Sequence, residues 1–196
     1  METRRGLLKK TLGGAVLLAA AGAVPIALRR TQLREPRGPL RFFTPAEYSV
    51  FAAIAERVLA RGPADVPPEL ASQTRPVAPS AAELDVAGKA DAFLAPLDET
   101  SAKDLKRLLA LFDNALFSVA TGGPPRPFTR MTPEEQDAHL ERWATSRLAV
   151  RRTGFQALKR LAAAIYYASP VTFASVGYPG PPYELVRTVN ASRRRP

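Results

Sequence analysis

The chain has no cysteine and only one histidine among its 196 residues. Without cysteine it can form no disulfide, no thiolate metal site, no covalently attached haem c and no cysteine nucleophile. A single histidine also excludes the di-iron bundle pattern, which needs a Glu-x-x-His motif on each of two helices. These absences do not identify the compartment, because exported proteins can also lack disulfides.

Motifs for nucleotide binding and hydrolysis are missing as well. The pair Gly122-Gly123 stands in a proline-rich turn, and Gly177-x-x-Gly180 does not follow a strand-like segment. Neither fits the strand–turn–helix context that a phosphate loop, a dinucleotide fingerprint or a nucleophile elbow requires. We therefore expect no catalytic, cofactor-binding or metal-binding residue in this chain.

The net charge of +10 lies at the two ends of the chain. Residues 1–41 hold nine basic and two acidic side chains, and residues 187–196 hold four basic and none acidic. Residues 42–186 hold fifteen basic and sixteen acidic side chains. A nucleic-acid-binding domain carries its positive charge on the folded surface that meets phosphate, so we expect no nucleic-acid partner.

The N-terminal residues match a twin-arginine export signal, S/T-R-R-x-F-L-K, with leucine at the phenylalanine position. The matching residues are Arg4, Arg5, Leu7, Leu8 and Lys9, followed by eighteen uncharged residues, 11–28. An ordinary membrane anchor flanked by positive charge is the alternative, and the register of the arginines and the lysine favours the export signal. A protein exported by this route crosses the membrane folded and can bring a cofactor-bearing subunit with it.

Removal of the signal is left open by the sequence. Residues 19–21 and 21–23 both satisfy a small-x-small cleavage rule. Eighteen uncharged residues also reach the short limit for spanning a bilayer. We expect a periplasmic location, with an inner-membrane anchor if the segment is retained.

Four regions follow along the chain: the signal segment 1–28, an Arg- and Pro-rich linker 29–41, a folded domain 42–186 and a basic tail 187–196. Within the domain, apolar residues recur at helical spacing and no strand alternation is visible. We predict an all-α single domain of five or six helices after the signal or anchor helix. Helices are expected to begin after Thr44, near Asp85, after Ser101, after Thr132 and after Ser169, with residues 147–167 continuing the fourth.

His139 shares a helix face with Glu135 and Arg142. The spacing is compatible with a carboxylate–histidine base or with two metal ligands. Because i,i+4 pairs of this kind are routine on helix surfaces, we expect an exposed ion pair without chemistry. Within residues 147–167, Gly154 is expected to mark either a bend between two helices or a point of close packing.

Aromatic residues concentrate in the last third of the domain. Tyrosine and tryptophan are favoured at protein interfaces because they combine apolar area with a hydrogen-bonding group. Core packing is the alternative, and we expect it for Phe155 and for one of the adjacent pair of tyrosines. The candidate partner interface is Trp143, Tyr166, Tyr167, Tyr178, Pro179 and Tyr183.

Six segments in order resemble the gluconate 2-dehydrogenase subunit 3 family, the small subunits of membrane-associated, flavin-dependent sugar and alcohol dehydrogenases. The segments are residues 42–48, 85–89, 128–136, 142–147, 166–170 and 177–181. The resemblance implies a non-catalytic role beside a large FAD-containing subunit of the glucose–methanol–choline class, and a multihaem cytochrome c as a further partner. It also implies that the small subunit supplies the signal read by the twin-arginine translocase and escorts the large subunit. A free-standing exported or membrane-anchored helical binding protein is the alternative function.

Overall fold

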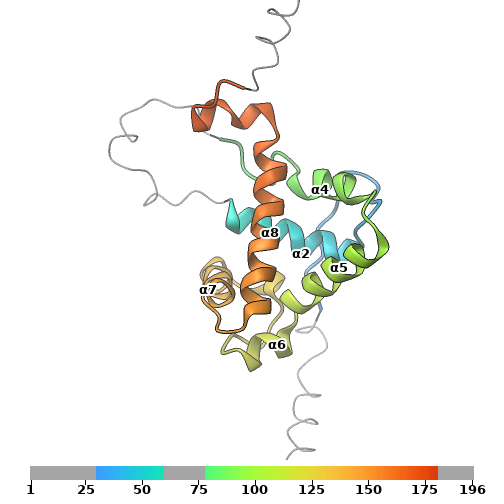
Figure 1. Cartoon of the computed structure of the whole chain (residues 1–196). Helices are drawn as coiled ribbons and strands as arrows, with labels where there is room; N and C mark the ends of the chain where they lie inside the picture. The colour runs from blue at the N-terminus through green and yellow to red at the C-terminus, as the bar shows by residue number, and fades with distance from the viewer. Residues whose placement is uncertain (1–29, 60–77, 181–196) are drawn as a thin grey trace, which may run out of the picture.

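The structure is a computed structural model that describes residues 30–59 and 78–180. Within these ranges it contains helices and no strand, which confirms the all-α prediction (Figure 1). The helices are α2 (Pro45–Val58), α4 (Val86–Leu94), α5 (Glu99–Phe112), α6 (Ala115–Ala120), η2 (Phe128–Arg130), α7 (Pro133–Ala144), α8 (Ala149–Tyr167), η3 (Pro170–Thr172) and η4 (Ala174–Val176). The predicted signal segment and basic tail lie outside the described residues.

Two helices begin at the capping boxes predicted from the sequence. Thr44 Oγ1 accepts a hydrogen bond from the backbone N–H of Glu47, whose carboxylate accepts one from the backbone N–H of Thr44. Thr132 and Glu135 repeat this arrangement at the start of α7. Each box satisfies two backbone N–H groups that have no partner within the helix.

The sequence predicts a third helix that begins after Ser101, continues to Val119 and ends at Gly122, and both of its ends are wrong. It begins after Asp98, whose carboxylate accepts a hydrogen bond from the Ser101 N–H at 3.0 Å, and it ends at Phe112. Asn114 then caps a separate helix, α6, by accepting a hydrogen bond from the Phe117 N–H at 2.9 Å. Aspartate and asparagine are strong N-caps, so they override the continuous apolar period that joins the two helices in the sequence.

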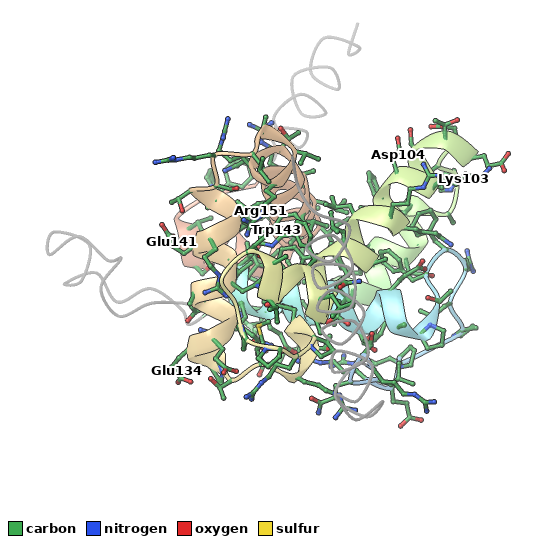
Figure 2. The ribbon with its side chains drawn as sticks, turned by 90° about the horizontal axis from the view of Figure 1, so that it is seen from below. Lys103, Asp104, Glu134, Glu141, Trp143 and Arg151 are labelled. Atoms are coloured by element: carbon green, nitrogen blue, oxygen red, sulfur yellow. The ribbon has the colours of Figure 1, made fainter. Side chains whose placement is uncertain are left out.

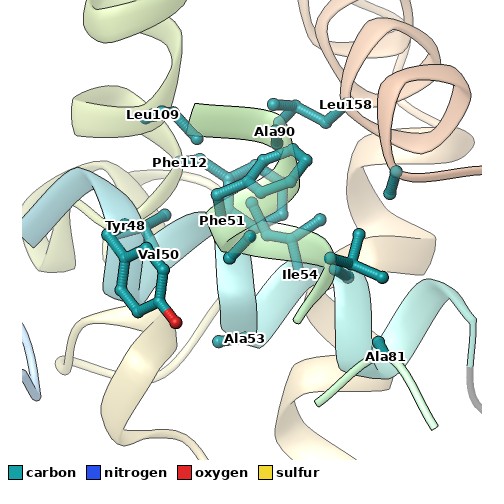
Figure 3. Close-up of a cluster of buried hydrophobic side chains, with 14 of the residues drawn as sticks. Tyr48, Val50, Phe51, Ala53, Ile54, Ala81, Ala90, Leu109, Phe112 and Leu158 are labelled. Carbon is teal, nitrogen blue, oxygen red and sulfur yellow. The ribbon is translucent and has the colours of Figure 1, made fainter. Parts of the chain in front are cut away.

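Helices α2 and α8 form the centre of the domain. α8 packs against α2, α4 and α7, and α2 also contacts α5 and η2 (Figure 1). Apolar side chains from four of these helices meet between them (Figure 3). The buried side chains that Figure 3 labels include Val50, Phe51, Ile54, Ala90, Leu109, Phe112 and Leu158.

α8 is one continuous helix, and Gly154 is a point of close packing within it. A Cβ atom at Gly154 would lie 2.6 Å from Leu108 Cδ1 and 3.3 Å from Trp143 Cζ3. Of the two predicted roles for this glycine, close packing is the correct one. The absence of a side chain lets α5 and α7 approach the N-terminal third of α8 together.

The first described residues, 30–43, are not helical and run along the surface of the domain. Side chains of α2 and α4 hold them by accepting hydrogen bonds from their backbone, with Ser49 Oγ accepting from Arg34 N at 2.8 Å. The Arg34 guanidinium also pairs with Glu56 at 2.5 Å. The predicted linker is therefore attached to the domain, and we call residues 30–43 the N-terminal segment.

No helix in the described part of the chain is long and apolar enough to cross a membrane. The anchor predicted from the sequence belongs to residues 1–28, which the structure does not describe.

Candidate functional site

The predicted interface residues divide between the core and the surface. Trp143, on α7, is completely buried, and Tyr166 is buried while its hydroxyl donates to the Pro79 carbonyl at 2.7 Å. Both side chains therefore contribute to the core and not to a surface of the folded domain. Tyr183 lies outside the described residues.

The remaining candidates gather at the C-terminal end of α8. Tyr167 and Tyr178 are 47% and 44% exposed, and Pro179 is also exposed. Two large apolar side chains next to them, Val171 and Val176, point into solvent as well. We call these five residues the C-terminal surface, which occupies one end of the domain (Figure 1).

His139 is buried, and the predicted surface ion pair is wrong. Its side chain is 1% exposed and packs against the rings of Phe112 and Phe128, at centroid distances of 4.9 and 5.4 Å. Glu135 is instead occupied by the capping box of α7. His139 and Trp143 are one helical turn apart on α7, so they share the face that packs against α5 and α8. This face is in the core, and His139 is buried with it.

Burial also changes the protonation of His139. Desolvation, together with the charges of Arg142 and Arg151, lowers its pKa from 6.5 to about 4. Neither ring nitrogen has a partner that meets hydrogen-bond geometry in the described structure. The imidazole is therefore neutral at pH 7 and behaves as part of the aromatic core.

A cluster of hydrogen-bond donors lies beside His139, where α6, α7 and α8 meet. Arg142 Nε and Nη2, Arg151 Nε and Nη2, Trp143 Nε1 and Ser118 Oγ are all buried and have no partner in the described part of the structure. The Arg151 guanidinium lies over the rings of Phe117 and Trp143. We call Ser118, Arg142, Trp143 and Arg151 the arginine cluster. Sequence reasoning missed it because arginines in a polar helical segment usually face solvent.

Two buried carboxylates hold the N-terminal segment. Asp91 accepts hydrogen bonds from three consecutive backbone N–H groups, those of residues 41–43, at 2.7 to 2.9 Å. Burial opposes the charge of Asp91, but these three bonds outweigh it and lower the pKa of its carboxyl. Asp113 accepts from Thr31 Oγ1 at 2.6 Å and from Thr129 N at 2.9 Å, and burial raises its pKa.

A small cavity of about 190 Å³ lies between the N-terminal segment and helices α2 and α4. The Tyr48 hydroxyl donates to Asp85 Oδ1 at 3.2 Å, and the polar residues that line the cavity are Arg34, Glu35, Arg37, Tyr48, Glu56 and Asp85. Burial and then the Asp85 carboxylate raise the pKa of Tyr48. The cavity is smaller than the roughly 300–1,000 Å³ of typical small-molecule sites, so we assign it no ligand. Over residues 30–59 and 78–180, no three histidine or acidic side chains lie close enough to hold a metal ion.

These features define an all-helical domain with an aromatic core, an arginine cluster and an exposed apolar end. The family model described as gluconate 2-dehydrogenase subunit 3 matches residues 45–180. The chain belongs to the gluconate 2-dehydrogenase subunit 3 family. It is an accessory subunit of the type that associates with a dehydrogenase complex. Neither the curated proteins nor the solved structures provide a match to it.

Proposed function

We propose that this chain is the non-catalytic small subunit of a periplasmic, FAD-dependent sugar or alcohol dehydrogenase, and the export escort of its large flavoprotein subunit. The observation that carries the proposal is the family match, which spans the helical domain from the first turn of α2 to the C-terminal surface. In this complex the glucose–methanol–choline-type subunit holds the FAD and oxidises the substrate. A multihaem cytochrome c subunit would accept the electrons.

The start of the fold supports export in the folded state. The N-terminal segment begins directly after the predicted signal, and Asp91, Asp113 and Ser49 bind its backbone and side chains. Thus the domain includes the residues that follow the signal. A large subunit bound to the folded domain would be connected to the translocase through a short length of chain.

The C-terminal surface provides a contact area for the large subunit. Tyr178 stacks edge-on with Phe173 at a centroid distance of 5.0 Å, which fixes its ring while leaving it exposed. Exposed aromatic and branched apolar side chains that are already ordered lose little entropy on binding. We propose that Tyr167, Tyr178 and Pro179 meet the flavoprotein there.

Co-expression with a flavoprotein encoded beside this chain tests the proposal. Both proteins should reach the periplasm together, and the substitution Arg4→Lys/Arg5→Lys should leave both in the cytoplasm. The matched control is Arg29→Lys/Arg30→Lys, a second arginine pair outside the signal motif, which should leave export unchanged. The escort role is wrong if the flavoprotein reaches the periplasm without this chain.

Purification of the native complex tests its composition. An absorption spectrum should show flavin, and haem if the cytochrome subunit is present. Recovery of this chain as a stable monomer, with no flavoprotein bound after co-expression, would instead support the free-standing binding protein.

A further inference from the structure

The N-terminal end of α8 collects positive charge without an acid to balance it. The cap residue Leu148 makes no side-chain hydrogen bond to the helix, and the first turn contains no acidic residue. Two arginines, Arg151 and Arg152, stand in that turn. A helix N-terminus carries a partial positive charge and favours acidic groups, so the arrangement is electrostatically unfavourable in the chain alone.

Arg151 is also removed from water. Only 6% of the residue is exposed, and its guanidinium carbon lies 5.7 Å from the Phe117 ring centroid and 5.4 Å from that of Trp143 (Figure 2). Its Nη1 group makes a long hydrogen bond of 3.4 Å to Ser146 Oγ, whereas Nε and Nη2 have no partner in the described structure. Ring faces stabilise the cation but do not accept all its N–H groups.

A second guanidinium, that of the half-buried Arg142, lies close to the first. Burial and the charge of Arg142 together lower the pKa of Arg151. Arg142 Nε and Nη2 are buried without a partner, and Nη2 would lie 3.0 Å from a Cβ atom placed on Gly123. The same Cβ atom would collide with Ser118 Oγ, so Ser118 and Arg142 converge on one small volume beside Gly123.

The charge of these two arginines has no counterpart among the described residues. The ion pairs found there join other residues, and none includes Arg142 or Arg151. A buried charge costs several kcal/mol unless it is paired, and buried donors without acceptors are rare in native proteins. The two guanidinium groups and the Trp143 indole can only donate, and only the Ser118 hydroxyl can also accept, so the group that would balance the two charges is an anion. A carboxylate has the geometry to accept two parallel bonds from a guanidinium.

Exposed apolar side chains stand on two of the helices that carry the cluster. Leu148 and Val150 flank it on α8, at 55% and 65% exposure, and Leu116 and Val119 are exposed on α6 on either side of Phe117. A free inorganic ion gains nothing from such a rim. A protein segment does, because interfaces combine buried arginine with apolar contact area.

We propose that the arginine cluster is a docking site for a protein partner, which inserts an aspartate or glutamate side chain flanked by apolar residues between Arg142 and Arg151. This site lies near the N-terminal end of α8, and the C-terminal surface lies at the other end (Figure 1). The identification of the partner as the flavoprotein rests on the proposed function, whereas the carboxylate site itself does not.

The first experiment uses the single tryptophan of the chain, Trp143, as a probe of the cluster. Purified full-length chain is titrated with sodium acetate against sodium chloride at constant ionic strength, and the tryptophan emission is recorded. We expect a saturable response to acetate alone, weakened at least tenfold by Arg151→Gln and by Arg142→Gln. Arg152→Gln is the matched control, because Arg152 is exposed on the same turn and should respond as the unsubstituted chain does. Circular dichroism identifies any variant that fails to fold.

The second experiment measures the affinity of the same variants for the co-expressed flavoprotein. Arg151→Gln should raise the Kd at least tenfold and Arg152→Gln should leave it within twofold. An unchanged Kd for Arg151→Gln, with acetate still bound by the unsubstituted chain, means a site for small anions only and overturns the protein-docking proposal. If acetate produces no response, the carboxylate site is wrong. If the flavoprotein does not bind at all, the proposed function fails, while the acetate titration still decides whether the site exists.

Discussion

At the scale of single residues, His139 makes the stability of the domain depend on pH. The pKa of His139 is about 4 in the folded chain, whereas an unperturbed histidine, as in the unfolded chain, has a pKa of 6.5. As the pH falls, the unfolded chain therefore binds the proton first. The stabilisation is complete above pH 6.5 and is lost as the pH falls towards 4, amounting to roughly 3 kcal/mol. Chemical denaturation between pH 7 and 4.5 should show this loss. His139→Phe should flatten the profile, and an unchanged slope in that variant would contradict the assignment.

Asp91 supports a second prediction at the same scale. Asp91→Asn replaces a two-oxygen acceptor with one oxygen and an NH₂ donor, so at least one of its three backbone N–H partners is left unpaired. The free energy of unfolding at pH 7 should fall by about 2 kcal/mol. The pKa of the Asp91 carboxyl is lower in the folded chain than its ordinary value of 3.8, so its contribution to stability is lost only as the pH falls below 3.8. The pH range of this loss is therefore below the range in which His139 acts.

The matched control for Asp91 is Asp104→Asn. Asp104 is an exposed carboxylate on α5 whose ion-pair partner among the described residues is Arg107, three residues along the helix. This substitution should change stability by less than about 0.5 kcal/mol. Hydrogen exchange should also rise across residues 41–43 in Asp91→Asn and stay constant in the control. Equal effects of the two variants would show that Asp91 does not hold the N-terminal segment.

At the scale of helices, Gly154 sets how closely α5 and α7 approach α8. A leucine at this position would place atoms within the volumes of Leu108 and Trp143. We expect Gly154→Leu to cost at least about 2 kcal/mol, because overpacking outweighs the roughly 1 kcal/mol gained in helix propensity. Thermal unfolding measures the loss. Lys159→Leu, on an exposed position of the same helix, should change little.

Helix boundaries were predictable where local and periodic signals agree. The Thr-Pro capping boxes of α2 and α7 place a cap, a first-turn proline and an apolar stripe in one register, and both starts are correct. The break between α5 and α6 was missed because the apolar spacing continues from Phe112 to Val119. Only the caps formed by Asp98 and Asn114 reveal it.

The site was less predictable than the fold for a physical reason. Periodicity shows that Trp143 and His139 share one face of α7, but it does not show whether that face is turned inward. Packing against Phe112 of α5 and against α8 decides this, and it depends on contacts distant in sequence. The burial of Arg151 in a first turn full of arginines has no local signal. Tyr167 and Tyr178 stay exposed because no described element covers the end of α8 beyond η3 and η4.

At the scale of the whole molecule, α8 connects two ends of the domain with different chemistry. Its C-terminal end carries tyrosines and valines, and its N-terminal end carries the arginine cluster with an apolar rim. A partner that contacted both ends would bind along the length of α8. The N-terminal segment is fixed to the same domain, so in the proposed export the residues that follow the predicted signal would move together with the core and both ends of α8.

Two variants should separate folding from partner binding during export. Phe51→Asp places a charge at a fully buried position and should unfold the domain. Because the twin-arginine route carries folded proteins, this variant and the flavoprotein should both stay in the cytoplasm although the signal is intact.

Tyr167→Ala/Tyr178→Ala removes exposed side chains and keeps the fold, so this chain should be exported while the flavoprotein stays behind, with the Kd raised at least tenfold. Fractionation of the two compartments measures both outcomes. Export of the flavoprotein with the tyrosine variant at the normal level would remove the C-terminal surface from the interface, and export of the unfolded variant would contradict the folded-state route.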